Sequence, residues 1–572
     1  MVSARRDKAD SYSISMRLFD LNNKIYANFW RKQEMKRCNV LFWLTVATLI
    51  VPNIVLDVTE GMSLMACLTN IALPMGVYML LLTSLKRMGK MVWALFPVIF
   101  FSAFQLVLIY LYGEGLLSVD MLLNAVTTNF GEATELLDGI APSVAIVCIL
   151  YLPILAWASI DLWKRRDILE HKARFRRTGM AVTMAGCMLL GATYFLDCQY
   201  DILDHLFPVN VFNNLRIAIQ RSYISANYQE SVKGFCHHAR PSHPKDSAEV
   251  YIMVIGETAR SDNFQLYGYR RETNPRLSRL KGLTVFKDAM TQSNTTHKSV
   301  PMLLTSATAN DYDVLYREKG IIAAFREAGF HTTFLSNQLP NHSFIDFLGE
   351  EADECLFVKK IASPGSNISD YDLLSHVKTV LAKKRKKEFI ALHTYGSHFS
   401  YKDRYPRSMA HFTPDQASEA KYANRRELVN AYDNTIRFTD SFLDSLTTIL
   451  IHQRVQSAWI YTSDHGENLY DDSQRRFLHS SPNPSLYELR IPFMVWTSQE
   501  YAASWPSVVK ALAANSRKPV ENSVSTYHTM LHLAGVTTDN FNPAASLASK
   551  SFTPAMRVYI NDHNIAKELQ WD

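Results

Sequence analysis

Carboxylate and imidazole side chains directly follow two apolar segments of the sequence. Glu257 comes after residues 250–255, and Asp464 and His465 come after residues 458–462. A mixed set of carboxylate oxygens and imidazole nitrogens suits a divalent ion, and it favours zinc or manganese over magnesium. The alternative is that Asp464 and His465 only cap a following helix. Such ligands at the ends of two separate apolar segments favour the metal site.

Further histidines accompany these groups. A third apolar segment, residues 388–393, ends at His393 and is followed by His398, and His479 lies beyond the Asp464 group along the chain. Imidazoles at these places would supply a second metal site or bind a phosphate group. The alternative is that His398 and His479 are ordinary surface histidines.

Group-transfer chemistry also needs a nucleophile. Residues 293–301 offer several hydroxyl side chains within one polar stretch. A nearby metal ion makes a hydroxyl group a better nucleophile at neutral pH. Residue types alone leave the choice among these hydroxyls open, and a polar turn with helix caps is the alternative.

The elements that would position these groups alternate between strands and helices from Glu249 onwards. This pattern predicts a largely parallel sheet covered by helices on both faces. Ligands of such sheets bind outside the carboxyl ends of the strands, so the polar groups are expected at one rim. The predicted strands are residues 250–255, 332–335, 388–393, 458–462 and 491–496, and the predicted helices are residues 321–328, 371–384, 425–451 and 524–534.

The first third of the chain has a different composition. Spanning about 30 Å of hydrocarbon takes about 20 helical residues, and five apolar stretches are long enough. They are residues 39–56, 63–85, 91–113, 141–163 and 178–196. The connection at residues 116–137 has apolar side chains at near-helical spacing, which predicts a helix on the outer membrane surface or an ordinary loop helix.

The charge pattern predicts the orientation of these spans. The 572 residues include 60 Lys and Arg against 54 Asp and Glu, a formal charge of +6. Basic residues cluster before the first stretch and between the fourth and fifth, whereas acidic residues follow the first and third. The positive-inside rule then places the N-terminus in the cytoplasm and everything after residue 196 on the opposite side. The basic balance therefore indicates topology and not a nucleic-acid partner.

Four parts follow from these patterns: a basic cytoplasmic segment (1–38), a transmembrane domain (39–196), a bridging helix with a linker (197–247) and an exported catalytic domain (248–572). Residues 209–228 are predicted to form the bridging helix. Residues 236–247 are rich in His, Pro and Ser and are predicted to form a solvated linker, with a metal site at His237, His238 and His243 as the alternative. A disulfide between Cys236 and Cys355 is a further open alternative.

Several motifs together resemble one family, the membrane-bound phosphoethanolamine transferases of Gram-negative bacteria, within the alkaline phosphatase-like superfamily. They are VIGETAR (254–260), YGYRRETNP (267–275), HTYGSH (393–398), RYP (404–406), YDN (432–434) and SDHGE (463–467). The resemblance covers nearly the whole chain. It implies a five-helix transmembrane bundle followed by an α/β alkaline phosphatase-like (sulfatase-like) domain, a bacterial inner-membrane location and a periplasmic catalytic domain.

The resemblance also implies residue roles. The family's Thr-x-x-Ser motif falls on residues 296–299, so Thr296 matches the threonine that carries phosphoethanolamine. Four positions match the family's catalytic zinc ligands, namely Glu257, Thr296, Asp464 and His465, and the resemblance implies one or two zinc ions. Three further positions match residues around the substrate phosphate or a further zinc, namely His398, Glu467 and His479. Asn337 and His393 are expected in the same pocket.

The implied reaction has two steps. Thr296 takes phosphoethanolamine from phosphatidylethanolamine with release of diacylglycerol, and an acceptor oxygen of a lipopolysaccharide or another envelope glycan then takes it from Thr296. The lipid A-modifying branch has cysteines where this chain has Gln292 and Met302. This departure favours a core sugar or another glycan as acceptor over a lipid A phosphate.

Three alternative functions compete with this one. A sulfatase shares the fold and metal ligands but needs a Cys/Ser-x-Pro-x-Arg motif, which the Thr296 segment lacks. A lipoteichoic acid synthase-like glycerol phosphotransferase also resembles the chain, but the stretch 268–275 favours the ethanolamine family. A non-catalytic membrane sensor or scaffold would have no need of the complete set of Glu257, Thr296, Asp464 and His465.

Overall fold

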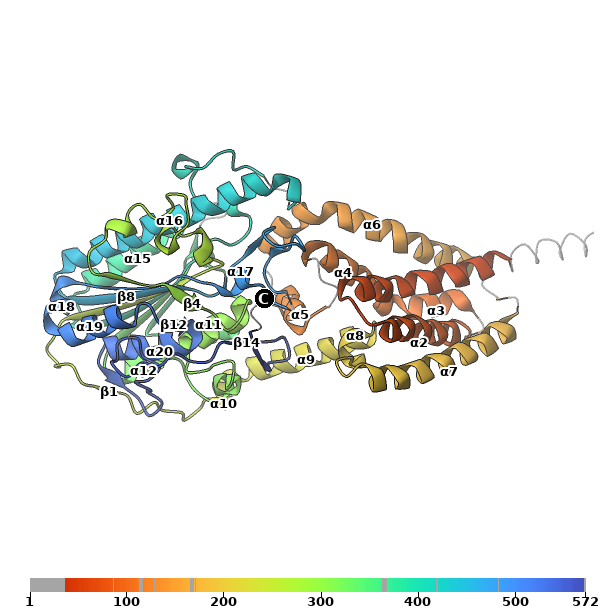
Figure 1. Ribbon diagram of the computed structural model, residues 1–572, viewed down its shortest axis with the longest axis horizontal. Coiled ribbons are helices and arrows are strands. Elements are labelled where there is room, and N and C mark those ends of the chain that lie inside the picture. Colours follow the sequence, from red (N-terminus) through yellow and green to blue (C-terminus); the bar gives the residue numbers. More distant parts are fainter. Residues whose placement is uncertain are drawn as a thin grey trace, which may run out of the picture. The chain divides into compact units, whose positions relative to one another are not determined.

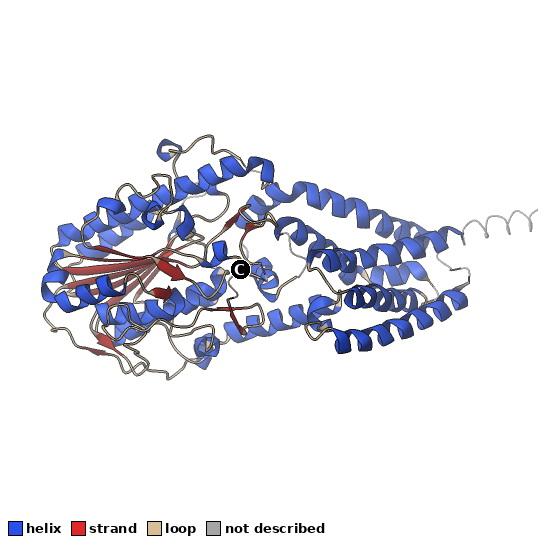
Figure 2. Cartoon of the chain, in the orientation of Figure 1, coloured by secondary structure: helices blue, strands red, loops and turns tan. Residues whose placement is uncertain are grey.

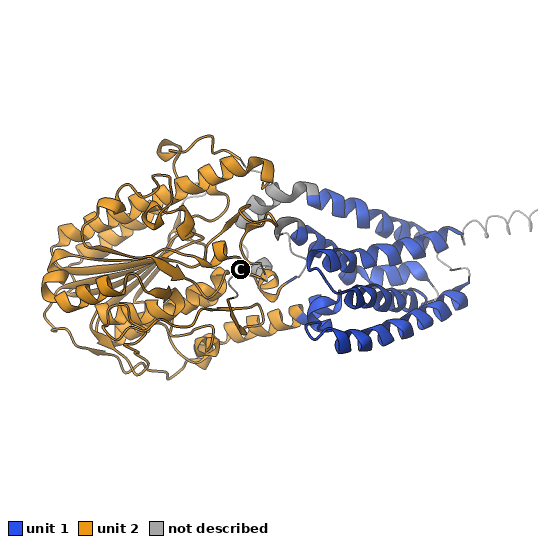
Figure 3. Ribbon diagram, viewed as in Figure 1, with its two compact units in different colours: residues 1–110, 114–117, 141–213 blue, residues 111–113, 118–140, 214–572 orange. Residues whose placement is uncertain are grey.

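The computed structural model describes residues 36–85, 87–112, 117–127, 130–164, 169, 171–362, 368–417, 420–481 and 483–569 (Figure 1). Most of the predicted basic segment, residues 1–38, lies outside the described residues. The chain forms two compact units (Figure 3). The first combines residues 1–110, 114–117 and 141–213, and the second combines residues 111–113, 118–140 and 214–572.

The first unit is helical (Figure 2). Within the described residues, four helices are long and apolar enough to cross a membrane, namely Lys36–Thr59, α2 (Leu64–Leu82), residues Ser143–Trp163 of α6 (Phe130–Trp163) and α7 (Lys172–Leu196). Hydroxyl groups link two of them, since Thr69 Oγ1 lies 2.8 Å from Thr193 Oγ1. The chain is therefore a membrane protein by the length and composition of its helices.

The third predicted span is broken. Residues 91–113 are predicted as one helix, but α3 (Met88–Ala94) and α4 (Phe96–Tyr112) meet at a bend of 53°. Pro97 has no N–H to continue the hydrogen bonds of α3, which explains a break at this place. Counting the bent pair as one broken span gives five spans, and counting it as a re-entrant loop gives four.

The second unit is built on a seven-stranded sheet in the order β3-β11-β8-β2-β7-β5-β6. The strands are β2 (Glu249–Gly256), β3 (Leu283–Phe286), β5 (His331–Ser336), β6 (Glu354–Phe357), β7 (Lys387–His393), β8 (Gln456–Ser463) and β11 (Phe493–Thr497). Only β11 runs antiparallel to its neighbours β3 and β8. All five predicted strands are present, and β3 and β6 are additional short strands.

Helices cover both faces of this sheet (Figure 1). Alternate residues of β2 separate into two cores: Tyr251, Met253 and Ile255 pack on one face, and Val250, Ile252 and Val254 pack on the other. This is the period of two that a buried strand requires. The first core contains α11 (Thr296–Leu304), α12 (Ile321–Glu327), α13 (Phe344–Gly349), α18 (Gln499–Ser504), α19 (Pro506–Asn515) and α20 (Asn522–Leu533); the second contains α15 (Tyr371–Ala382) and α16 (Arg425–Gln453). The predicted α/β architecture is confirmed.

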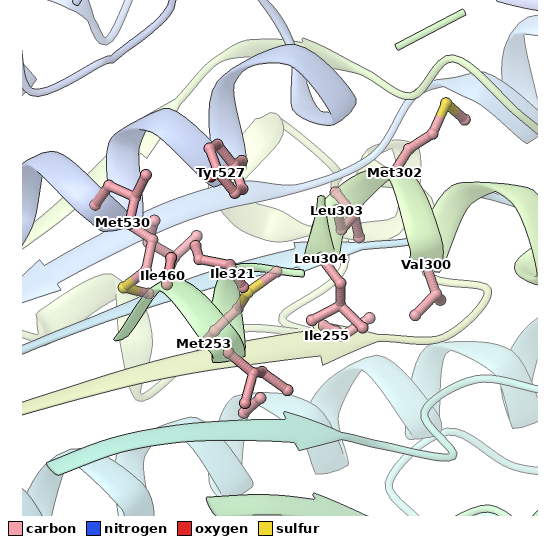
Figure 4. Packing of buried hydrophobic residues seen from close by; sticks show 14 of the residues in the cluster. Met253, Ile255, Val300, Met302, Leu303, Leu304, Ile321, Ile460, Tyr527 and Met530 are labelled. Atoms are coloured by element: carbon pink, nitrogen blue, oxygen red, sulfur yellow. The ribbon is translucent and has the colours of Figure 1, made fainter. Parts of the chain in front are cut away.

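Figure 4 shows how the first core holds the helix α11. Val300, Met302, Leu303 and Leu304 are fully buried and belong to the same cluster as Ile255 of β2. The sequence predicts only a polar segment here, because Pro301 and the hydroxyl residues before it are unfavourable for a helix. Packing of the apolar side chains against the sheet compensates for that low propensity.

Residues 236–247 are mostly exposed, as predicted for a linker, but the segment is fixed at several points. Their short strand β1 (Arg240–Pro241) pairs with β13 (Val536–Thr537). The buried ring of His237 lies 3.0 Å from the Gly320 carbonyl oxygen. The buried ring of His243 stacks on Trp505 at 4.0 Å. These histidines therefore tie the segment to the sheet unit, and Cys236 and Cys355 are separate thiols.

The helix α5 (Val119–Thr127) belongs to the sheet unit, although it lies in sequence between the third and fourth apolar stretches. Val119, Met121 and Leu122 are buried. The described part of the predicted apolar face is thus packed inside protein. The remaining described helices include α8 (Ile202–His205), α9 (Val209–Ala226) and α10 (Tyr228–Ser231), and α9 occupies most of the predicted bridging helix.

Candidate metal and nucleophile site

The rim at the carboxyl ends of β2, β7 and β8 carries the predicted site residues. In the parallel register Ile255 faces His393, and Gly256 faces Ser463. Glu257 follows β2, His393 ends β7, and Asp464 follows β8. Because neighbouring parallel strands end at the same edge, residues far apart in the sequence meet there.

Three of these side chains form a compact buried group. The ligand atoms of Glu257, Asp464 and His465 all lie within 4.8 Å of one another. Thr296 Oγ1 lies 3.0 Å from Glu257 Oε1 and 3.0 Å from His465 Nε2. Asp464 Oδ2 lies 3.2 Å from His465 Nε2. The structure thus brings together the four residues that were predicted to bind the metal ion.

Backbone groups orient two of the ligands. The N–H groups of Thr258 and His465 donate to Asp464 Oδ1 at 2.9 Å and 2.7 Å, which leaves Oδ2 to face the group. His465 Nδ1 lies 2.9 Å from the Gly466 carbonyl oxygen. A proton on Nδ1 satisfies that carbonyl and leaves the Nε2 lone pair for a metal ion.

Two glycines permit the backbone to pack closely here. Gly396 has φ +49°, and a Cβ at this position would lie 2.6 Å from the Glu257 carbonyl oxygen and 2.9 Å from its nitrogen. A Cβ on Gly466 would overlap the Tyr487 carbonyl oxygen. A side chain at either position would displace the backbone that carries a ligand.

The electrostatics of the group fit a divalent cation. Asp464 Oδ2 is buried and faces His465 Nε2 at 3.2 Å. Burial and the Glu257 carboxylate raise the pKa of Asp464 well above its usual range. For Glu257, burial alone would raise the pKa, but the nearby rings of His393, His465 and His398 lower it. A bound cation would relieve the repulsion between these two buried carboxylates, which is the usual reason such groups are tolerated.

A second polar group lies beside the first. Glu467 Oε1 is 3.2 Å from His479 Nδ1, and the His479 ring lies 4.1 Å from the His465 ring and 6.3 Å from the His398 ring. Burial lowers the pKa of His479 to about 4 and that of His465 to about 3. Both rings are therefore neutral at neutral pH, the form that binds metal ions or accepts a proton.

Asn337 occupies a supporting position. Its Nδ2 donates to Asp370 Oδ1 at 2.8 Å, and its backbone N–H donates to the His393 carbonyl oxygen at 2.9 Å. The neighbouring Gln338, which the sequence motifs do not identify, donates from Nε2 to Glu257 Oε2 at 3.0 Å. Its position directly after β5 at the same rim is the signal that would have found it.

The structure distinguishes among the hydroxyl groups of residues 293–301. Ser293 Oγ and Thr295 Oγ1 lie 3.1 Å from each other, and Ser299 Oγ donates to the Thr295 carbonyl oxygen at 2.9 Å. Only Thr296, the first residue of α11, contacts both Glu257 and His465 among these described hydroxyls. A helix N-terminus favours a negative group, so a phosphate on Thr296 would be stabilised there.

The chain belongs to the sulfatase family, whose model matches residues 249–536. A full-length relative, "Kdo(2)-lipid A phosphoethanolamine 7''-transferase" of Salmonella typhimurium, is 25% identical over 80% of this chain and 85% of its own length. The expected resemblance to phosphoethanolamine transferases is therefore confirmed.

Two solved structures share the fold. The integral membrane lipooligosaccharide phosphoethanolamine transferase A (EptA) of Neisseria meningitidis matches 89% of this chain and 98% of its own with a TM-score of 0.71 and 20% identity. The C-terminal periplasmic domain of EptC from Escherichia coli, in complex with Zn, matches 58% of this chain and 96% of its own with a TM-score of 0.53 and 24% identity. These matches confirm the combination of apolar helices with an alkaline phosphatase-like domain.

Proposed function

We propose that the protein transfers phosphoethanolamine from phosphatidylethanolamine to a lipopolysaccharide or another envelope glycan through a covalent intermediate on Thr296. The observation that carries this proposal is the position of Thr296 Oγ1, 3.0 Å from both Glu257 Oε1 and His465 Nε2 at the start of a helix. The similarity to a transferase of Kdo(2)-lipid A supports the transferred group.

In the first step a bond forms between Thr296 Oγ and the donor phosphorus, and the bond from phosphorus to the glycerol oxygen breaks. Glu257 accepts the Thr296 proton, since its Oε1 lies within hydrogen-bond distance of Oγ1. A proton then goes to the leaving glycerol oxygen, and diacylglycerol is released. A zinc ion would supply Lewis-acid stabilisation of the phosphoryl charge. It would be held by Glu257, Asp464, His465 and Thr296. We propose one or two zinc ions at the site and prefer zinc to manganese.

In the second step an acceptor oxygen attacks the same phosphorus, the bond from phosphorus to Thr296 Oγ breaks, and Thr296 Oγ regains a proton to match the one that the acceptor hydroxyl gives up. The group formed by His398, Glu467 and His479 lies next to His465 and would bind the phosphoryl oxygens or a further zinc ion. Because the His479 ring is neutral at neutral pH, it can accept the proton of the acceptor hydroxyl. His393 and Asn337 would support this pocket from the ends of β7 and β5.

The donor is a membrane lipid, which suits a chain with apolar spanning helices. We assign residues 39–196 to the bacterial inner membrane, with the N-terminus in the cytoplasm, residues 197–247 to the bridge, and residues 248–572 to a periplasmic catalytic domain. The alternating charges of the connections support this orientation.

The surroundings of the nucleophile bear on the acceptor. Gln292 Oε1 accepts the Ala309 N–H at 2.8 Å, and Met302 is fully buried in the core. These two positions thus pack as ordinary polar and apolar side chains. We propose a core sugar or another glycan as the acceptor rather than a lipid A phosphate.

The test is intact-peptide mass spectrometry of the detergent-solubilised full chain after incubation with zinc and phosphatidylethanolamine. A phosphoethanolamine adduct on the peptide that contains Thr296 is expected, and it should vanish in Thr296→Ala. Ser299→Ala is the matched control, because Ser299 lies in the same helix but donates to the Thr295 carbonyl oxygen. A glycerol phosphate adduct from phosphatidylglycerol alone would favour the lipoteichoic acid synthase-like reaction, and the absence of both adducts would refute covalent transfer.

A further inference from the structure

A buried charge network lies directly beside the proposed nucleophile. Lys298 Nζ donates to Asp120 Oδ2 at 2.6 Å, and His297 Nε2 lies 3.1 Å from Asp120 Oδ1. Arg221 Nη1 lies 3.5 Å from the same oxygen. The side chains of Asp120 and Lys298 are only 7% and 2% exposed. His297 and Lys298 are the two residues that follow Thr296 in α11.

The network joins four segments that are far apart in the sequence. Asp120 comes from α5 and Arg221 from α9. The segment after β14 (Val558–Ile560) completes the network, because Lys298 Nζ donates to the Asn561 carbonyl oxygen at 2.7 Å and Arg221 Nη1 donates to the Asp562 carbonyl oxygen at 2.5 Å. All of these residues belong to the sheet unit.

Asp120 supplies the carboxylate that faces Lys298. The other oxygen within reach of the ammonium is the neutral Asn561 carbonyl. Without the Asp120 charge, the buried ammonium group would keep the Asn561 carbonyl as its one hydrogen-bond partner among the described residues, with the Asp562 carboxylate nearby. Buried charges avoid such an arrangement by moving toward water. Such a movement of Lys298 would rotate or unwind the first turn of α11.

That turn must be held accurately because Thr296 lies in it. Its Oγ1 has to reach Glu257 and His465 at once. On the preceding side Asn294 is fixed, since its Nδ2 donates to Glu488 Oε2 at 2.5 Å and to the Ser481 carbonyl oxygen at 2.8 Å. The Asp120 contacts hold the following side. The first turn is therefore anchored both before and after the nucleophile.

We propose that Asp120 is a positioning residue for the transfer reaction: through Lys298 and His297 it holds the start of α11 so that Thr296 faces the metal-binding group. This inference rests on the proposed role of Thr296. Asp120, which lies in sequence between the third and fourth apolar stretches, would thus help to position the nucleophile of the sheet unit.

The test is the single-turnover rate of adduct formation on Thr296 in the full-length protein. We expect Asp120→Asn to slow this step about 100-fold, the size of effect that a 1 Å displacement of a reacting group produces, with zinc content unchanged. Asp120→Glu keeps the charge and should recover most of the rate. Because Asp120 acts through Lys298, the double variant Asp120→Asn with Lys298→Met should be no slower than Asp120→Asn alone.

Asp440→Asn is the matched control for the loss of a buried carboxylate. Asp440 lies in α16 and accepts the backbone N–H groups of Arg276 and Leu277, so its loss should lower the unfolding temperature without slowing adduct formation. A wild-type rate in Asp120→Asn, additive losses in the double variant, or a rate loss that only follows loss of zinc would overturn the inference. Failure of the unmodified protein to form any adduct would instead refute the proposed function, and the inference with it.

Discussion

Replacing Gly396 with Ala should separate a steric effect at the proposed metal site from a general backbone effect. Gly396 follows β7 with φ +49°, and its Cβ would lie 2.6 Å from the Glu257 carbonyl oxygen and 2.9 Å from the Glu257 nitrogen. Both contacts are with backbone atoms, which cannot rotate away as a flexible side chain can. The loop after β7 and the residue that carries a proposed ligand must therefore move apart.

Two contributions set the size of the effect. A non-glycine residue in the left-handed region costs about 1–2 kcal/mol. Inserting a methyl group into a tightly packed place adds about 1–3 kcal/mol when the surroundings shift. The free energy of unfolding should therefore fall by about 2–5 kcal/mol in Gly396→Ala. If the structure relaxes by displacing Glu257, part of this loss becomes weaker zinc binding.

The control is Gly329→Ala. Gly329 has φ +86°, but a methyl group at this position would have no other atom within 4 Å among the described residues, so only the backbone cost applies. The assay is chemical unfolding of the full-length protein in detergent, together with zinc retention after dialysis. Gly396→Ala should be the less stable variant or should lose zinc. Equal stability and equal zinc retention in the two variants would refute the steric argument.

Three further predictions concern buried charges. Zinc at 100 times its Kd should stabilise the protein against thermal unfolding by about 2.7 kcal/mol. Asp464→Asn should abolish this gain. In the zinc-free protein the same variant should be the more stable one, because it removes the repulsion between Asp464 and Glu257. Burial raises the pKa of Glu351 from 4.5 to about 7. The contribution of Glu351 to stability is therefore present below pH 4.5 and lost as the pH rises through about 7. The urea midpoint of the unmodified protein should fall with pH over this range, and in Glu351→Gln this fall should disappear. Arg260→Ala removes one of the two arginines that pair with Asp471, since Arg425 Nη2 also lies 2.7 Å from Asp471 Oδ1. The free energy of unfolding, measured with denaturant, should therefore fall by about 1–3 kcal/mol, and an unchanged stability would contradict a contribution from this buried pair.

The rim residues could be placed from the sequence because each follows an apolar strand. Glu257 and Asp464 are adjacent in space because β2 and β8 are parallel neighbours that end at the same edge of the sheet. The short edge strands β3 and β6 could not be identified, since four residues give too little periodicity. The helix α11 was hidden by Pro301 and by its polar first turn, and it forms because its apolar residues pack on the sheet.

Residues whose environment depends on distant partners were the hardest to interpret. His243 lies in a stretch with the composition of a linker, and its burial depends on Trp505. Asp120 is one acidic residue among several in a connection, where it indicates topology, and its burial depends on Lys298 and Arg221. No local pattern identifies such partners, because long-range packing overrides composition.

The joining of α5 to the sheet unit has a consequence for how the protein folds. Asp120 is synthesised before the fourth and fifth apolar stretches, whereas Lys298 and Asn561 follow much later along the chain. Contacts of such high sequence separation form slowly, because the loop that they close is long. The turn that carries Thr296, the proposed nucleophile, can therefore reach its final arrangement only after residue 561 has been synthesised, so that incomplete chains would lack the finished form of the proposed site.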